Sequence, residues 1–531
     1  MEFSRIVRSC LGTRHKGILD HAQTLGVLIQ NILLSPAPLY RIAEWAQPID
    51  PTALELSTSE KSSLNDDRVA RSLDALVTPR ARTLFFRLAV QIIEQFELDT
   101  QRIHHDTTTV TFSGLYKTSH GEPRISRGIN KDHRPDLKQL VFGLNVTADG
   151  AVPISHDVYS GNRTDDTIHR SNVERLRQVL RRTDFVYVAD SKLATRKNLA
   201  HVAKYGGKFV TVLPRTRAED KRFRKMLREG APVRWRKLIE TENHRRKSDP
   251  PDVYSSTTGD PERTSEGYRI VWIRSSQKLE RDALVRQTLL EKAEVELFDL
   301  NTRLNVGKLR RRSAIQKKVA EILVAHNCQR FFEVRIAFQT QIETKHLRRG
   351  RPRKGDPVKR IRRRVYHLVV RRNKHALRAE ARTDGVFPLT TNLETPKAPK
   401  KEVLLIYKYQ PYVEKRHALF KSELEVAPVY IKKPLRAVGL IHAAFLAMTL
   451  DALIERTVRA GMLRHGIETL PILPEGRATR TPTTARILEM FSDVGWYEFE
   501  RGGETVTFPI QLSTLQKQLL RLLDIDPSVY L

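Results

Sequence analysis

Three acidic residues, far apart in the chain, have a placement that could support metal-dependent chemistry. Asp106 lies in a stretch rich in β-branched residues, Asp190 ends an apolar run that begins at Phe185, and Glu414 lies in the first turn of an expected helix. If the two strands are neighbours in one sheet, the carboxylates converge, and carboxylates so close repel each other unless cations lie between them. Hard oxygen ligands suit Mg²⁺, and two such ions can drive phosphoryl transfer at a phosphodiester.

An acid at the end of a strand is also an ordinary polar terminus, so these residues alone leave both interpretations open. The surrounding pattern predicts strands over residues 103–110, 140–146, 152–158, 185–190 and 209–213, with helices over 166–180 and 197–205. Three consecutive strands followed by alternating helix and strand predict an α/β fold with one mixed sheet and helices on both faces. Such a sheet would place the strands that carry Asp106 and Asp190 within one core.

The rest of the chain divides by its composition and periodicity. Apolar residues recur at helical spacing over much of the first hundred residues. The regular alternation breaks down after Pro214, and the core is expected to resume at Val403–Tyr407. We expect a helical N-terminal domain, a candidate for binding DNA ends, over 1–100, a catalytic domain over 101–214 and 401–460, a large basic insertion over 215–400, and a C-terminal region, a candidate for dimerisation, over 461–531.

The charge of the chain indicates a polyanionic partner. It has 531 residues, and 93 Lys and Arg against 61 Asp and Glu give a net charge of 93 − 61 = +32, which favours nucleic acid.

Two cysteines are too few for a disulfide framework. The absence of a P-loop and of a glycine-rich dinucleotide motif implies no nucleotide cofactor. The most apolar run, 438–454, is interrupted by His442 and Asp451 and is interpreted as a buried helix, so no membrane is expected.

Four short passages carry a more specific signal. They are His105–Thr108, the segment Lys131–Gln139 together with Gly161–Asp165, Val188–Ser191, and the spacing of Tyr407, Glu414 and Lys421. Together they resemble the bacterial insertion-sequence transposases of the DDE superfamily, in the group with a Tyr-Arg-Glu-Lys motif and a large insertion before the final Glu. The resemblance covers about residues 100–455.

This resemblance implies an RNase H-like catalytic domain and defined roles for single residues. Asp106, Asp190 and Glu414 would be the catalytic residues and would bind two Mg²⁺ or Mn²⁺ ions. Tyr407 and Lys421 would hold phosphates of the DNA end near the site. From the residues alone, Tyr407 could equally be an aromatic residue at the end of a strand.

One position departs from the motif. Gln410 stands where the group has Arg, and Gln supplies neither the charge nor the fork of donors that holds a phosphate. We expect Gln410 to make a weakened contact with DNA, or a neighbouring cation such as Lys408 or Lys415 to replace it.

The insertion contains a strongly basic segment. Arg348, Arg349, Arg351 and Arg353 resemble an AT-hook, whose Arg-Gly-Arg-Pro core can lie in a narrow minor groove, but the short pattern favours a loop that binds phosphates without sequence preference. Arginines at 362–364 and 371–372 flank an expected strand over 365–370. Their density predicts a surface that faces DNA.

The function expected from the sequence is therefore that of a DNA transposase of an insertion sequence. It would cleave double-stranded DNA at terminal inverted repeats and transfer the strands into target DNA, acting as a homodimer on DNA in the bacterial cytoplasm, at the nucleoid. The alternatives are a metal-dependent nuclease of the same fold without strand transfer and a DNA-binding protein that has lost catalysis.

Overall fold

A computed structural model gives the fold of the chain. It describes residues 2–12, 19–114, 116, 123–131, 134–242, 250–347, 351, 357–422, 424, 431, 433–495, 497–501, 504–508 and 510–530. The chain divides into two compact units. The first contains Met1–Val212, Thr391–Lys397 and Glu402–Leu531, and the second contains Leu213–Thr390 and Ala398–Lys401. Asp106, Asp190 and Glu414 all belong to the first unit.

Five strands of the first unit form the mixed sheet expected from the sequence. They are β1 (Arg102–Phe112), β2 (Lys138–Thr147), β3 (Pro153–Ser160), β4 (Val186–Ala189) and β5 (Lys208–Val212). Their order is β3-β2-β1-β4-β5. The pairs β1–β2 and β2–β3 are antiparallel, whereas β1–β4 and β4–β5 are parallel. An antiparallel meander extended by parallel strands with helical connections is the RNase H-like arrangement, which confirms the expected fold class.

Helices cover both faces of this sheet. Phe142 of β2 stacks on Phe420 of α14 (Pro411–Ser422), with ring centroids 4.5 Å apart. Asn145 points to the opposite face, because side chains alternate along a strand, and its amide donates to Asn172 Oδ1 of α7 (Asp165–Leu180) at 2.7 Å. β2 is buried at nearly every position, as a strand between two helical layers must be.

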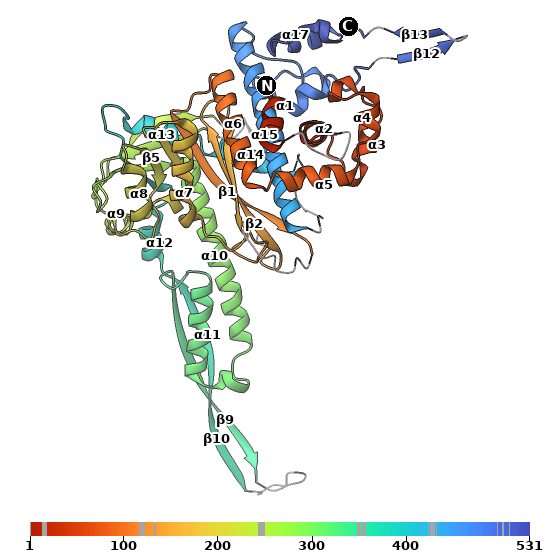
Figure 1. Ribbon diagram of the computed structural model, residues 1–531. Helices are drawn as coiled ribbons and strands as arrows, with labels where there is room; N and C mark the ends of the chain where they lie inside the picture. Colours follow the sequence, from red (N-terminus) through yellow and green to blue (C-terminus); the bar gives the residue numbers. More distant parts are fainter. Residues whose placement is uncertain are drawn as a thin grey trace. The chain divides into compact units, whose positions relative to one another are not determined.

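The N-terminal helices share a hydrophobic core with the sheet. They are α1 (Phe3–Leu11), α2 (His21–Leu34), α3 (Ile42–Ala46), α4 (Thr58–Ser62), α5 (Asp66–Ala75) and α6 (Pro79–Gln95). A single cluster of buried apolar side chains includes Leu25 and Leu28 of α2 as well as Leu140 and Phe142 of β2. Figure 1 shows these helices beside the long helix α15 (Pro434–Arg464), on which α2 and α5 pack.

Helix α15 is the buried helix expected from the apolar run. It is long and apolar enough to cross a membrane by length and composition alone, but 78% of its most apolar window is buried inside the protein. That burial is typical of a core helix. The chain continues through α16 (Thr484–Glu489), the hairpin of β12 (Tyr497–Arg501) and β13 (Glu504–Phe508), and α17 (Thr514–Leu522).

The second unit begins with a helix and four sheet strands. These are α9 (Ala218–Glu229), β6 (Arg236–Thr241), β7 (Asp252–Thr257), β8 (Arg269–Ser275) and β11 (Val386–Thr391). The strands run in the order β11-β8-β7-β6. The ring of Trp272 in β8 stacks on Phe223 of α9 at 3.9 Å and is fully buried.

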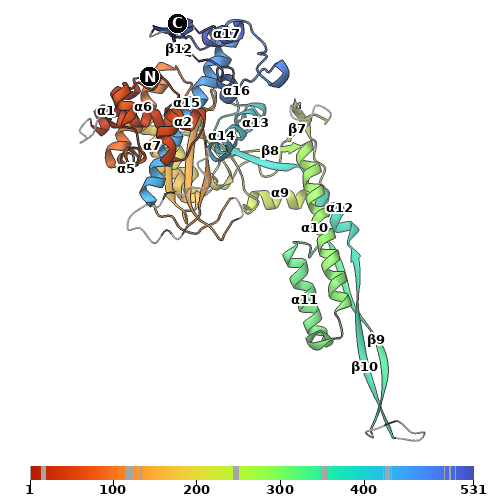
Figure 2. The ribbon, with the colours of Figure 1, turned by 90° about the vertical axis from the view of Figure 1, so that its right-hand side faces the viewer.

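The second unit also contains an arm with its own core. Helices α10 (Ser276–Thr302) and α11 (Arg312–Ala325) pack on a hairpin of β9 (Phe332–His346) and β10 (Val358–Arg372), which is followed by α12 (Lys374–Ala381). The buried side chains Leu290, Leu297 and Ile315 of the two helices form the centre of this core. Both views show the two strands extending beyond the ends of α10 and α11 (Figures 1 and 2).

One segment differs from the expectation. Val403–Tyr407 lies in a helix, α13 (Lys400–Lys408), so Tyr407 is not at the end of a strand. A run of five apolar residues has the same appearance in a buried strand and in a helix. The exposed Leu405, between buried Leu404 and Ile406, shows that only one face of this helix packs on the core.

Candidate active site

Asp106 and Asp190 occupy matched positions on two adjacent strands. His104 of β1 pairs with Val188 of β4 in parallel register. Asp106 lies two residues after His104, and Asp190 lies two residues after Val188, directly beyond the end of β4. Because residues at matched register share a face, the two carboxylates belong to the same edge and face of the sheet.

The turn after β4 holds Asp190 in place. The carboxylate caps the short 3₁₀ helix Ser191–Leu193 and accepts a hydrogen bond from the backbone N–H of Lys192 at 3.0 Å. The backbone oxygen of Asp190 accepts from Thr211 Oγ1 of β5 at 2.6 Å. These bonds fix the backbone and one carboxylate oxygen.

Glu414 is presented from the first turn of α14, which packs against β1 and β2. Partial burial and the negative charge of Asp106 raise the pKa of the Glu414 carboxyl, while the ammonium of Lys131 opposes that rise. A carboxylate affects a neighbour in this way only when the two are close. Glu414 therefore lies near Asp106, although the two are 308 positions apart (414 − 106).

Tyr407 lies within the field of all three carboxylates. Burial raises the pKa of its phenol, and the charges of Asp190, Glu414 and Asp106 raise it further. The phenol is therefore protonated at neutral pH and can donate a hydrogen bond. Tyr407 and the three carboxylates thus form one cluster of side chains in the first unit.

The three carboxylates lie near one another, but their side chains are not in the geometry of a metal-bound site. Among the described residues, no three side chains of His, Cys, Asp or Glu are arranged closely enough to hold a metal ion. Their donor chemistry nevertheless fits Mg²⁺ or Mn²⁺, which prefer carboxylate oxygens. Burial and the charge of Asp106 raise the pKa of Glu414 in spite of Lys131, and a divalent cation bound beside these carboxylates would favour their ionised forms.

Lys131 is a site residue that sequence reasoning missed. Its Nζ atom lies 3.4 Å from Asp106 Oδ1 and donates to Thr107 Oγ1 at 2.8 Å and to the Thr107 carbonyl. The one available signal was its position at the start of the segment Lys131–Gln139. Asp132 and His133 of that segment lie outside the described residues.

The expected DNA contact of Gln410 is corrected by the structure. Gln410 is only 6% exposed. Its Oε1 atom lies 3.1 Å from His104 Nδ1, and its Nε2 atom donates to the His105 carbonyl at 2.7 Å. Both ends of the amide are thus used to join the turn before α14 to β1, so Gln410 is a structural residue and not a surface donor for phosphate.

The lysines of α14 differ in their surroundings. Lys421 follows Glu414 by seven residues, which is two helical turns, so the two share a face of α14. Burial lowers the pKa of His417, one turn before Lys421 on this helix, and the charges of Lys131 and Lys421 lower it further. Lys415, one of the two proposed substitutes for the missing Arg, is exposed and lies over the ring of Tyr412, 4.6 Å from its centroid. Lys408, the other, ends α13.

A buried ion cluster fixes the position of α14. Arg416 donates to Asp451 Oδ2 at 2.6 Å and to Glu455 Oε2 at 2.9 Å, both on α15, and to the carbonyl of Ala151 at 3.1 Å. Arg416 is two residues from Glu414. The cluster therefore ties the helix that presents Glu414 to the core helix and to the loop before β3.

The other predicted DNA contacts belong to the second unit. Arg351 is exposed, whereas Arg348, Arg349 and Arg353 lie outside the described residues. The exposed arginines 362–364 lie within β10.

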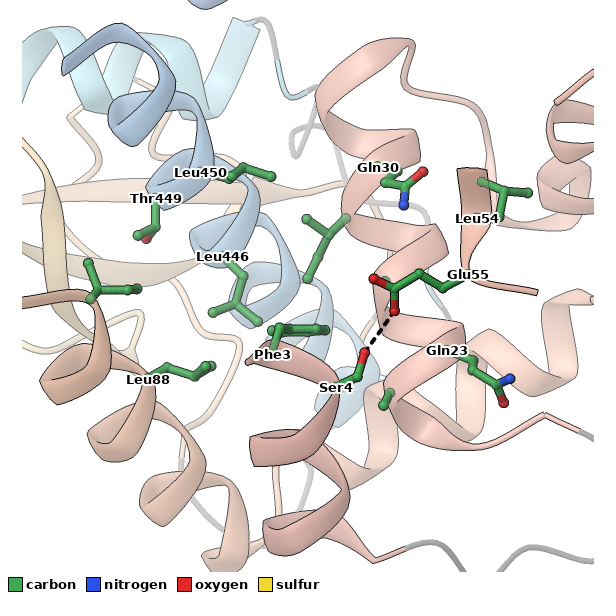
Figure 3. A pocket seen from close by; sticks show the side chains of 14 residues that line it. Phe3, Ser4, Gln23, Gln30, Leu54, Glu55, Leu88, Leu446, Thr449 and Leu450 are labelled. Carbon is green, nitrogen blue, oxygen red and sulfur yellow. Dashed lines mark hydrogen bonds between the residues drawn. The ribbon is translucent and has the colours of Figure 1, made fainter. Parts of the chain in front are cut away.

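A separate cavity of about 200 Å³ lies among α1, α2, α6 and α15. Figure 3 shows Leu446 and Leu450 of α15 at its wall and Ser4 donating to Glu55, a bond of 3.0 Å. Of the described residues that line it, Glu55 alone is titratable. This cavity lacks the paired acids or bases of a catalytic site and is a gap in helix packing.

Comparisons with known proteins show a match to a family model over one part of the chain and weak similarities to solved structures. Residues 1–90 match a family described as a domain of unknown function, DUF4277. No curated protein matches the chain.

Among solved structures, a synaptic complex of piggyBac transposase with hairpin DNA matches 52% of this chain and 57% of its own, with 13% identity and a TM-score of 0.26. A pre-cleavage Mos1 transpososome matches 37% of this chain and 60% of its own, with 10% identity and a TM-score of 0.15. The chain thus spans less than two thirds of the solved chains that it matches.

Proposed function

We propose that this protein is a DNA transposase of an insertion sequence, in which Asp106, Asp190 and Glu414 are the catalytic acids. The observation that carries the proposal is the placement of these residues. Two acids lie at matched positions on parallel strands of an RNase H-like sheet, and a third approaches from a helix. The substrates would be the terminal inverted repeats of the element and a target duplex, bound by a homodimer in the bacterial cytoplasm, at the nucleoid.

The three carboxylates would bind two Mg²⁺ or Mn²⁺ ions. When bound, such ions activate the attacking oxygen of a phosphodiester substitution and stabilise the leaving oxygen. Asp190 is oriented for binding by the backbone N–H of Lys192. Glu414 is held by the anchoring of α14 through Arg416.

Two further side chains would position the DNA strand. The protonated phenol of Tyr407 can donate to a phosphate oxygen beside the carboxylates. The ammonium of Lys421 shares a helix face with Glu414 and can pair with the next phosphate. Gln410 has no such role, because its amide is bonded within the protein.

The test is a strand-transfer reaction with precut ends. The DNA that flanks the gene would supply the terminal inverted repeats, and these would be offered as duplexes with a free 3′-hydroxyl together with a supercoiled plasmid and Mg²⁺. A transposase joins the ends to the plasmid. A nuclease of the same fold would cut uncut ends without joining precut ones, and a protein that has lost catalysis would bind both and change neither.

A further inference from the structure

The distal half of the β9–β10 hairpin carries a row of arginines on one face. Each residue of β10 is paired with one of β9, and directly paired residues share a face. Arg360, Arg362 and Arg364 alternate along β10 and therefore lie on one face, opposite Thr344, Ile342 and Thr340 of β9. All six side chains are exposed. We call these six residues the arginine face.

The proximal half of the same face anchors the hairpin to the arm. Ile336, Tyr366 and Leu368 pack on the core formed by α10 and α11. Asn305, after α10, donates to the Tyr366 carbonyl at 2.9 Å and accepts from its N–H at 2.7 Å. Asn301 accepts from the N–H of Leu368 at 2.7 Å. These bonds occupy outer-edge backbone groups of Tyr366 and Leu368 and attach this half of β10 to the end of α10.

The opposite face of the distal half has a different charge pattern. Lys345 and Lys359 pair with each other across the strands, and Arg363 lies beside Glu343 with an ion pair of 2.9 Å. The arginine face contains no acid. Its Arg364 lies over the ring of Phe338, 4.8 Å from the centroid, which orients the guanidinium on this face.

We propose that the arginine face enters the major groove of double-stranded DNA. The groove is about 12 Å wide and admits a two-stranded β-ribbon, whose strands lie about 4.8 Å apart. Arginine is suited to the acceptors of guanine and to phosphates, and Thr and Ile methyl groups can contact the methyl group of thymine. The inference deepens the proposed function, because it rests on DNA as the partner, but it does not depend on catalysis by the carboxylates.

Two matched triple variants test this assignment. Arg360→Gln, Arg362→Gln and Arg364→Gln remove three charges from the arginine face, and Lys345→Gln, Lys359→Gln and Arg363→Gln remove three from the opposite face. Binding of the full chain to a random-sequence duplex is measured without divalent metal over a series of salt concentrations. Each lost phosphate contact lowers the slope of log K against log salt by about 0.9. For the arginine-face variant, we expect the slope to fall by about 2–3 and the affinity to fall at least tenfold. For the variant of the opposite face, we expect the slope to fall by less than about one and the affinity to fall less than about threefold.

Protection of guanine N7 from methylation in the wild-type complex is an independent test of entry into the major groove, because N7 lies in that groove. The proposal predicts protection that is lost in the arginine-face variant. Equal effects of the two variants, or an unprotected N7, would overturn it. Failure of the wild-type protein to join precut ends, with its DNA binding intact, would instead contradict the proposed catalysis, so the two failures are distinguishable.

Discussion

The ammonium of Lys131 lies 3.4 Å from the Oδ1 atom of Asp106 and opposes the rise in pKa that burial and the charge of Asp106 cause at Glu414. One lysine thus supplies positive charge to two of the three acids proposed to bind metal. In the metal-free protein it partly offsets their repulsion. Lys131 therefore lies beside the carboxylates to which a divalent cation is proposed to bind.

Replacing Lys131 with Gln should therefore make the protein more dependent on metal. Without metal, we expect a loss of about 0.5–1 kcal/mol in the free energy of unfolding, because the pair is partly exposed. Mg²⁺ or Mn²⁺ should then raise the melting temperature of the variant more than that of the wild type. Thermal unfolding with chelator and with metal measures both. Lys197→Gln, in the exposed part of α8 (Arg196–Ala203), is the control, and equal metal-induced shifts in all three proteins would contradict the account.

Substitutions of Gln410 should lower the stability of the fold and leave the affinity for DNA unchanged. Gln410→Ala leaves His104 and the His105 carbonyl without their partner, which we expect to cost about 1–3 kcal/mol. Gln410→Arg restores the residue of the motif but buries a charge, so it should be at least as destabilising.

Chemical denaturation and DNA binding separate the two roles of Gln410, with exposed Gln101→Ala as the control. A stable Gln410→Arg variant that binds DNA more tightly would show that the position faces DNA after all.

The sequence was sufficient for the five strands β1 to β5, but not for β6, β7, β8 and β11 or for the contacts that join distant segments. The β-branched run of Thr107–Val110 and the apolar run before Asp190 predicted β1 and β4, because local composition largely determines such strands. The convergence of Asp106 and Asp190 followed from treating those strands as neighbours. The short apolar run before Tyr407 was assigned wrongly, because its length suits a helix as well as a strand.

Long-range polar pairs left no signal in the sequence. Asp451 was visible only as an interruption of an apolar run, and nothing nearby indicated that Arg416 neutralises it. The interior position of Gln410 was equally hidden, because its partner His104 is 306 positions away (410 − 104). Such pairs depend on the packing of elements that only the fold brings together.

The ion cluster of Arg416 should be critical for the position of α14. Arg416→Met would leave Asp451 and Glu455 buried without a counter-charge, and we expect a loss of about 3–5 kcal/mol in the free energy of unfolding. Arg486→Gln, which breaks an exposed ion pair with Glu489, should cost at most about 1 kcal/mol. Urea unfolding compares them. Similar losses would mean that the buried cluster contributes no more than a surface pair.

Buried histidines should make the protein sensitive to mild acid. Burial lowers the pKa of His104, His417 and His442 to about 4 and that of His105 and His169 to about 3. Between these values and the unfolded value near 6.5, the unfolded chain binds more protons, so stability falls as the pH falls. Each such histidine contributes a slope of about 1.4 kcal/mol per pH unit below pH 6.5.

Urea unfolding at pH 7.5, 6.5 and 5.5 measures this dependence on pH. We expect little change over the first interval and a steep loss over the second. A stability that is constant down to pH 5.5 would mean that these rings are not held neutral in the folded protein.

The most direct measurement is DNA cleavage at the terminal inverted repeats by Asp106→Asn, Asp190→Asn and Glu414→Gln, each with Mg²⁺ and each with binding assayed in parallel. Glu94→Gln, at an exposed position of α6, is the matched control. We predict that the wild type and the control cut only when metal is present, while the three site variants bind the ends and do not cut. Full cleavage by any one of the three site variants would contradict this prediction.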